Sequence, residues 1–265
     1  MLTLVLLASF FTQQTASAAG SAPPAIAAQG FADSRGGLKA PALPATGPQA
    51  LGPEMRGDIF MARKMYREAA EMYKQMDPSS AITWNKVGIA YHQMLDLDAA
   101  KRYYERAAKI NPKYPEAVNN LGTIHYAKKN YRRAVSSYRR ALRLTPDSAS
   151  ILSNLGTAYF ARKSYDEAFK AYQQALALDP EVFEHRGAAG VMLQERTVEE
   201  RAKFHFYLAK TYAKSGNSER ALMYLRKALE EGFKERDRMN DDPSFAAMRE
   251  LPEFQELLQY KPKVL

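Results

Sequence analysis

Five landmark positions recur at intervals of 34 residues in the middle of this chain. They are the glycines 88, 122 and 156, the alanines 100, 134 and 168, the tyrosines 104, 138 and 172, the alanines 107, 141 and 175, and the prolines 112, 146 and 180. A fixed period of this length is typical of stacked-repeat architectures, in which each unit packs only against its neighbours. The sequence therefore predicts an extended binding scaffold.

Each unit is predicted to contain two helices that cross closely. Trp84, Val87 and Tyr91 share one face of the first helix, while Tyr104 and its neighbouring alanines share one face of the second. The small residues Gly88 and Ala100 allow the helix axes to approach. Proline cannot continue the helix behind it, so Pro112 ends the pair.

At these positions the chain resembles the tetratricopeptide repeat (TPR) family. The resemblance is specific in the unit 81–114, where eight family positions are filled identically or conservatively. His125 departs from the pattern, because the family favours tyrosine there. The resemblance implies an all-α fold, a right-handed α-α superhelix of about five helix-turn-helix repeats with a C-terminal helical cap.

The resemblance extends over roughly Pro53 to Phe233, with degenerate units on both sides of the regular ones. Upstream, Ala69 and Tyr73 take second-helix roles, and the turn that follows is about three residues short. The expected organisation is a signal peptide (1–18), a disordered linker (19–52), a degenerate TPR (53–80), three TPRs (81–114, 115–148, 149–182), an inserted loop (183–200), a further TPR (201–234) and C-terminal capping helices (235–265).

The N-terminus predicts a periplasmic or secreted location. Residues 2–11 form an apolar run, and Ala16-Ser17-Ala18 has the small-x-small pattern of a signal-peptidase site. No lysine or arginine precedes the run, and an uncleaved apolar terminus is the alternative. The run is too short to span a bilayer in the mature chain. Residues 19–52 are rich in Ala, Pro, Gly and Ser, which predicts a flexible tether.

The resemblance implies that the first helices line a concave groove that binds a peptide or protein. The groove residues are then Ile82, Asn85, Lys86, Ile89, His92, Asn119, Asn120, Thr123, Tyr126, Ser153, Asn154, Thr157 and Phe160. Asn120 and Asn154 occupy equivalent places, and an amide can both donate to and accept from a peptide bond. The alternative for each asparagine is a bond to a neighbouring helix.

A second series, His92, Tyr126 and Phe160, either contacts a ligand or packs between repeats. The family's clamp for a C-terminal carboxylate is not expected. Lys86 and Asn120 partly fit it, but Ser150 and Asn154 stand where basic residues would be required.

The net charge of +9 leaves a second function open. Arginines 132, 133, 139, 140 and 143 concentrate in one second helix, which the resemblance places on the convex side. They form either a solvated face or a surface that attracts polyanions or an anionic membrane. Nucleic acid is not expected as a partner, because no recognition motif is present.

The insertion and the C-terminal tail also carry predictions. Thr197 and Glu200 form a capping box, so a helix should begin near Val198. Residues 187–194, with the apolar trio 191–193, are expected to fold against a neighbouring first helix and limit access to the groove; a functionless excursion is the alternative. Two short helices, in DDPSFAAM and LPEFQELL, should seal the end of the array.

No enzymatic activity, cofactor or metal is expected. The chain has no cysteine, its four histidines lack metal-ligand spacing, and it contains no phosphate-binding loop or nucleophile elbow. The sequence favours an interaction adaptor that supports an envelope, secretion or pilus complex. It names neither the partner nor the oligomeric state.

Overall fold

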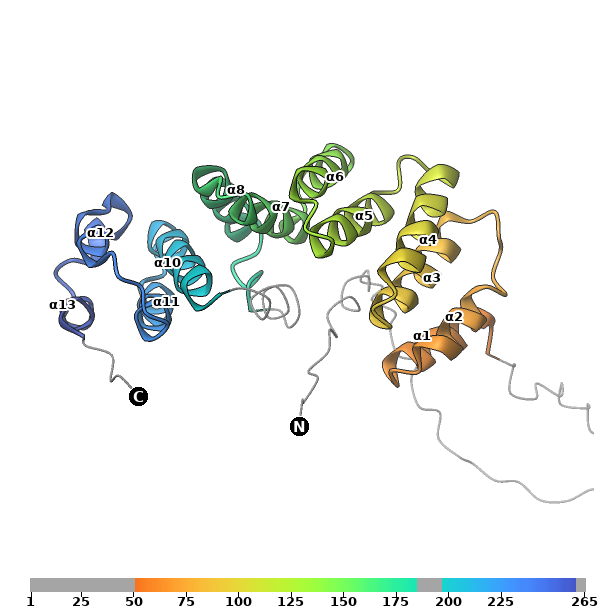
Figure 1. Cartoon of the computed structure of the whole chain (residues 1–265), viewed down its shortest axis with the longest axis horizontal. Coiled ribbons are helices and arrows are strands. Elements are labelled where there is room, and N and C mark those ends of the chain that lie inside the picture. Colours follow the sequence, from red (N-terminus) through yellow and green to blue (C-terminus); the bar gives the residue numbers. More distant parts are fainter. Residues whose placement is uncertain (1–50, 185–196, 261–265) are drawn as a thin grey trace, which may run out of the picture.

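The computed structural model describes residues 51–184 and 197–260, and these residues form an array of helix pairs (Figure 1). The pairs are α1 (Pro53–Ala62) with α2 (Tyr66–Tyr73), α3 (Ala81–Gln93) with α4 (Leu97–Ile110), α5 (Pro115–Ala127) with α6 (Tyr131–Leu144), α7 (Ala149–Ala161) with α8 (Tyr165–Leu178), and α10 (Val198–Lys214) with α11 (Ser218–Glu230). No strand occurs in these two ranges. The predicted all-α solenoid of about five helix pairs is confirmed.

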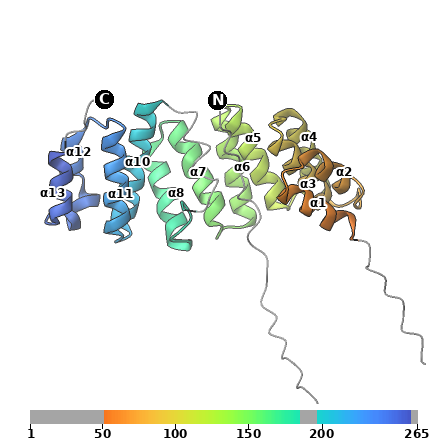
Figure 2. The same ribbon diagram turned by 90° about the horizontal axis from the view of Figure 1, so that it is seen from below.

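The pairs follow one another along the long axis of the molecule, with neighbouring helices standing side by side (Figure 2). The first helices of the three regular repeats start at Ala81, Pro115 and Ala149, 34 residues apart, and each is 13 residues long. Their second helices are 14 residues long, whereas α2 has only 8. The 34-residue period therefore corresponds to helices of constant length in the centre of the array.

A glycine–tyrosine contact closes each of the first four helix pairs. A β-carbon at Gly122 would lie 2.5 Å from Cε1 of Tyr138, and one at Gly88 would lie 2.6 Å from the Tyr104 ring. The same contact joins Gly57 to Tyr73 and Gly156 to Tyr172. All four tyrosines are buried. Glycine is required at these positions because any side chain would occupy the space that the tyrosine ring fills.

The turn inside each pair contains a residue in the left-handed region of backbone space. These residues are Lys64, Leu95, Lys129 and Lys163, with φ between 58° and 63°, and in the last pair Gly216, with φ of 82°. Asp96 then caps α4 through a hydrogen bond from the backbone N–H of Ala99 (2.9 Å). In four of the five pairs this left-handed residue is neither glycine nor asparagine, the types that favour the conformation.

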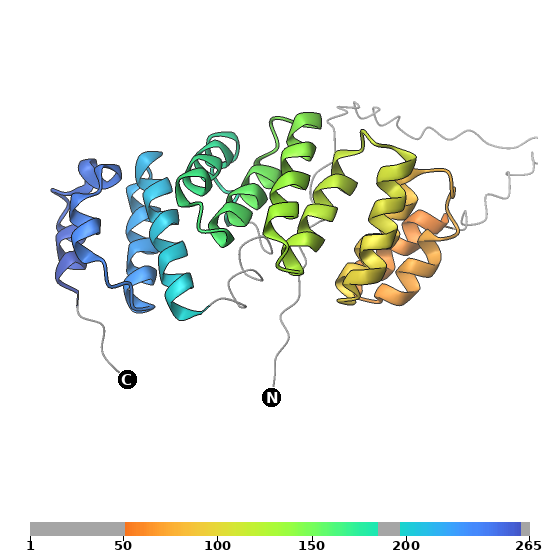
Figure 3. The ribbon, with the colours of Figure 1, turned by 45° about the horizontal axis from the view of Figure 1, so that its top comes forward.

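The capping box at Thr197 is confirmed, since both of its hydrogen bonds are present and α10 begins at Val198. After α11 the chain forms α12 (Arg236–Asp241), the 3-10 helix η1 (Pro243–Met248) and α13 (Pro252–Gln259). Two of these segments were predicted; α12 was not. The apolar residues Met239, Phe245, Met248, Phe254 and Leu257 are buried, so the three short helices cover the end of the array (Figure 3).

Three sequence-based predictions lie wholly or mostly outside the described residues. These concern the signal peptide, the linker and the folding back of residues 187–194. None of the helices in residues 51–184 and 197–260 is long and apolar enough to cross a bilayer.

Candidate functional site

The predicted groove residues lie on α3, α5 and α7, and the structure joins them by hydrogen bonds between neighbouring first helices. The Asn120 side-chain N–H donates to Oδ1 of Asn85 (3.0 Å), and that of Asn154 donates to Oδ1 of Asn119 (3.3 Å). Both bonds connect residues 35 positions apart. An equal offset shows that the three helices run parallel and in the same register.

Further bonds turn these two pairs into one continuous amide chain. Asn119 Nδ2 donates to Oδ1 of Asn120 (3.4 Å), and Asn85 Nδ2 donates to the hydroxyl of Tyr114 (3.4 Å). The amide chain thus runs from Asn154 through residues 119, 120 and 85 to Tyr114. Asn85, Asn119 and Asn120 are buried, and burying an amide without partners would be costly. The bonding to neighbouring helices left open for the asparagines is present; ligand contact stays a prediction.

Asn154 differs from the other members of the amide chain. Its side chain is partly exposed, and its Oδ1 has no hydrogen-bond partner among the described residues. It therefore keeps an acceptor free at the open end of the amide chain. Beside it on α7, Ser150 is exposed, whereas Ser153 and Thr157 are buried, and the Thr157 hydroxyl donates to the Ser153 carbonyl oxygen (3.0 Å).

The equivalent joint between α1 and α3 is ionic. Lys86 Nζ lies 3.1 Å from Oε1 of Glu54 and 2.7 Å from Oδ1 of Asp58. Glu54 and Lys86 stand 32 positions apart, because the preceding turn is three residues short. The pattern search found Lys86 but missed both carboxylates, although that offset in the sequence was the available signal.

A second polar contact connects the groove side with the core of each pair. The Tyr138 hydroxyl donates to Oγ1 of Thr123 (3.2 Å), the Tyr172 hydroxyl to Thr157 (3.3 Å), and the Tyr73 hydroxyl to Asp58 (2.7 Å). Each bond spans 15 residues. In the pair α3/α4 the equivalent position is Ile89. The Tyr104 hydroxyl therefore has no side-chain partner among the described residues, and burial raises its pKa.

The series His92, Tyr126 and Phe160 packs against neighbouring rings. Phe160 is buried, with ring centroids at 5.2 Å from Tyr165 and 5.4 Å from Phe204. Tyr126 lies 5.3 Å from Tyr131, and His92 contacts the edge of Tyr104. Burial lowers the pKa of His92 to about 4, which keeps the imidazole neutral. These residues belong to the packing of the groove wall.

The first helix α10 makes contacts that sequence reasoning missed. Lys210 Nζ lies 2.7 Å from Asp242 and 5.2 Å from the centre of the Tyr207 ring. Both partners of the ion pair are largely buried. The pair fixes the terminal cap to the fifth repeat.

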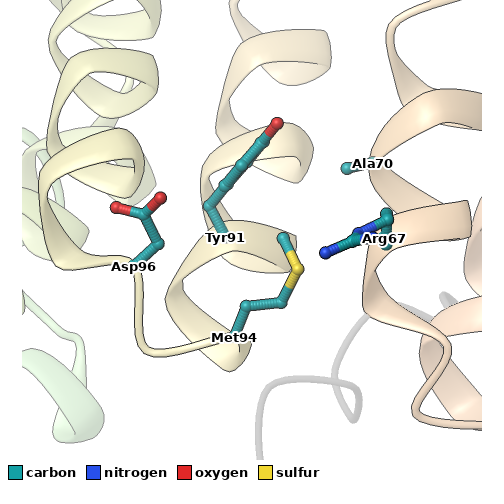
Figure 4. A pocket seen from close by; sticks show the side chains of 5 residues that line it. All are labelled: Arg67, Ala70, Tyr91, Met94 and Asp96. Atoms are coloured by element: carbon teal, nitrogen blue, oxygen red, sulfur yellow. The ribbon is translucent and has the colours of Figure 1, made fainter.

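A separate cavity of about 340 Å³ opens between α2 and the end of α3 (Figure 4). Arg67, Ala70, Tyr91, Met94 and Asp96 line it, and Arg67 points toward the sulfur of Met94 (Figure 4). Within the described ranges no group of three or more His, Asp or Glu residues could hold a metal ion.

The basic second helix α6 keeps its charges in solvent. Its five arginines are exposed, and no ion pair is recorded for them in the described part of the chain. Arg139 lies over the ring of Tyr159, and Arg140 donates to the carbonyl oxygen of Pro112 (3.2 Å). Both contacts leave the positive charge uncompensated.

Comparison with known proteins identifies the repeats. The tetratricopeptide repeat profile matches residues 88–147 and 119–182, and a second profile of the same name matches residues 202–231. No curated protein matches the chain in sequence.

Solved structures share the arrangement of helix pairs at low identity. "Crystal structure of MamA" is 21% identical with a TM-score of 0.47, and covers 66% of this chain and 93% of that chain. "MamA 41-end from Desulfovibrio magneticus RS-1" is 19% identical with a TM-score of 0.48 (71% and 95%). "Crystal structure of YrrB: a TPR protein with an unusual peptide-binding site" is 19% identical with a TM-score of 0.45 (68% and 84%).

The glycine–tyrosine helix pairs, their 34-residue register and the matched profiles agree with one another. Residues 88–182 and 202–231 of this chain are tetratricopeptide repeats.

Proposed function

We propose that the protein is a non-catalytic adaptor that binds an extended segment of a partner protein along α3, α5 and α7. The observation that carries the proposal is the parallel register of these helices, which places equivalent residues one repeat apart along a single face. An extended peptide presents its own donors and acceptors at regular intervals, so a surface with a constant repeat can match it.

The exposed members of this face define the contacts that a partner would make. Ile82 is 47% exposed and offers an apolar contact, and Glu116 and Ser150 are exposed at the equivalent positions of the next two repeats. Asn154 offers its free acceptor. The buried amides of residues 85, 119 and 120 act as the floor that holds these contacts at a fixed spacing.

The test is site-specific photo-crosslinking in cells. A crosslinker at Ile82 or Ser150 should capture one defined partner, and Asn154→Lys should reduce that capture by placing a charge in the face. Crosslinkers at Lys170 and Arg132, on second helices, are the matched controls. Capture of the same partner with equal yield from the second helices would refute the groove as the binding face.

We also propose that the adaptor acts in the cell envelope, in support of an envelope, secretion or pilus complex. The support is the apolar run at residues 2–11 with the Ala16-Ser17-Ala18 pattern. N-terminal sequencing of the protein from a periplasmic fraction should find a new terminus near residue 19. An intact Met1 in a cytoplasmic fraction would disprove this location.

A second candidate function rests on the five exposed arginines of α6. Their uncompensated charge would attract a polyanion to the convex face, with an affinity that falls steeply as salt rises. Arg132→Gln with Arg133→Gln, Arg139→Gln and Arg140→Gln should abolish retention on heparin. Retention that is the same at low and high salt would contradict it.

A further inference from the structure

The turns inside the repeats form a basic edge that neither proposed function uses. Because the first helices run parallel, their C-terminal ends lie along the same side of the array. We define the hairpin edge as residues 63–65, 94–96, 128–130 and 162–164, which are the turns between the helices of the first four repeats.

Three of these four turns carry two adjacent basic residues: Arg63-Lys64, Lys128-Lys129 and Arg162-Lys163. Five of the six side chains are exposed and form no ion pair within the described residues. The sixth, Lys128, is paired with Asp98. The other acidic side chains nearby are those of Glu68, Asp96, Asp166 and Glu167, and Asp96 is engaged as the cap of α4.

The hairpin edge also exposes large apolar side chains. Leu95 is 59% exposed and Met65 is 37% exposed, and both lie at turns. Leu95 has φ of 62°, and lysine occupies the equivalent position in the other three turns of the hairpin edge. A leucine gains nothing for the fold in this position, because it is neither buried nor suited to a left-handed backbone.

The combination points to one kind of partner. We propose that the hairpin edge docks on an anionic lipid surface, with the basic pairs against the headgroups and Leu95 and Met65 inserted at the interface. Basic residues beside exposed apolar ones are the pattern of interfacial membrane binding. Single-stranded nucleic acid would require free aromatic faces, but Tyr131 packs on Tyr126 and Tyr165 stacks on Tyr207.

The opposite edge differs in charge. The turns between repeats contain Asp77, Asp147, Asp179 and Glu181 together with Lys113, and the last turns of α4 and α6 add Lys109 and Arg143. This mixture would not favour the same docking. The proposal therefore predicts an orientation, with the helix axes pointing toward the bilayer and the concave face left open at the side.

The first experiment measures binding of the full chain to vesicles of phosphatidylcholine alone or mixed with phosphatidylglycerol. The edge variant combines Arg63→Gln, Lys129→Gln, Arg162→Gln and Lys163→Gln. Each basic residue near such a surface contributes about fivefold to partitioning, so a loss on the order of a hundredfold or more is expected. The matched variant Arg102→Gln, Lys109→Gln, Lys170→Gln and Arg226→Gln removes as many exposed charges from second helices other than α6, and should keep most of the binding.

Both variants retain the N-terminal segment, so any affinity of that segment for lipid cancels between them. Thermal unfolding of each variant verifies the fold. An equal loss in both variants, or no binding by the parent chain, overturns the proposal. So does a loss of binding to polyuridylate with vesicle binding unchanged, which would assign the edge to nucleic acid.

The second experiment locates the contact. The chain has no cysteine, so Leu95→Cys introduces a unique site for an environment-sensitive dye. Brominated lipids should quench this dye strongly. The control is Ile110→Cys, at the other end of α4, where the side chain is 39% exposed on the opposite edge. Equal quenching at both sites, or quenching only at residue 110, would contradict the orientation.

Discussion

The contacts between neighbouring first helices differ in chemistry between the regular repeats and the repeat that precedes them. Between α3, α5 and α7 the neighbouring helices are connected by neutral amides, whereas between α1 and α3 the equivalent positions hold Glu54, Asp58 and Lys86. The amides of residues 85, 119 and 120 are buried, whereas Asp58 is partly exposed and Glu54 is exposed. The joints between first helices should therefore be insensitive to salt in the centre and sensitive to it at the N-terminal end.

The largest expected effect concerns the protonation of His92, which lies on α3 in the regular repeats. Its pKa of about 4 in the folded state lies below the ordinary value of 6.5 because the ring is buried. The unfolded chain therefore takes up the proton first, so stability is full above pH 6.5 and falls as the pH drops toward 4. The expected loss is about 3 kcal/mol.

Chemical denaturation across this pH range checks the prediction. His92→Phe introduces the residue found at the equivalent place in the fourth repeat, Phe160, and should remove most of the loss. His205 serves as a second histidine for comparison, because, unlike the ring-packed His92, it has a carboxylate oxygen of Glu231 at 2.7 Å from its Nδ1. If the variant and the parent lose the same stability between pH 6.5 and 4, His92 is not the group responsible.

Replacement of the packing glycines should separate the centre from the end of the array. Gly122→Ala places a carbon 2.5 Å from the Tyr138 ring and should lower the unfolding free energy by about 2 kcal/mol. Gly57→Ala creates an equally close contact with Tyr73, but only in the terminal repeat. Hydrogen exchange should show lost protection across α3–α8 for the first variant and mainly in α1 and α2 for the second. An equal loss of hydrogen-exchange protection in α5 from both variants would contradict this difference between the centre and the end of the array.

The two kinds of joint can be compared directly by removing one member of each. Asn120→Leu leaves Oδ1 of Asn85 and Nδ2 of Asn119 without a partner, at a cost of about 1–2 kcal/mol that should not depend on salt. Lys86→Met should cost less, about 1 kcal/mol or below, and its effect should shrink as salt rises. Urea unfolding at low and high sodium chloride measures both. Salt dependence in the asparagine variant would contradict the assignment of a neutral joint.

The smallest effect concerns the turns. Leu95→Gly should stabilise the protein by about 0.5 kcal/mol, because glycine relieves the left-handed strain but adds entropy to the unfolded chain. The fifth repeat already has Gly216 at this turn, and nothing lies within 4 Å of a β-carbon placed there. Gly216→Leu should therefore destabilise by a comparable amount through backbone strain alone. Thermal unfolding of the two variants should shift in opposite directions.

Sequence spacing predicted the fold because the contacts that hold each helix pair together lie within one repeat. Gly88 and Tyr104, or Gly122 and Tyr138, lie within one 34-residue unit, so their pairing appears in the pattern of that unit. The capping box at Thr197 is equally local. The left-handed turn residues could not be predicted, because Lys64 and Leu95 carry no preference for that conformation.

The site was harder to predict because its contacts cross from one repeat to the next. The pattern placed Asn120 and Asn154 on the correct helices, but did not show which side chains their amides meet. The bonds run to Asn85 and Asn119, one repeat plus one residue away. Once that offset is known, it also relates Glu54 to Lys86, if the shorter first turn is taken into account.

The amide chain also determines which whole repeats can be removed from the array. Asn120 and Asn154 occupy the same place in consecutive repeats, and both donate to an asparagine of the helix before them. Deletion of residues 115–148 would bring Asn154 to the position of Asn120, facing Asn85, where it could make the hydrogen bond that Asn120 makes in the full array. Removal of residues 81–114 would instead set Asn120 against Glu54 and Asp58, two carboxylates without their cation. The length of this protein can change by whole units in its centre, while its first repeat accepts one neighbour only.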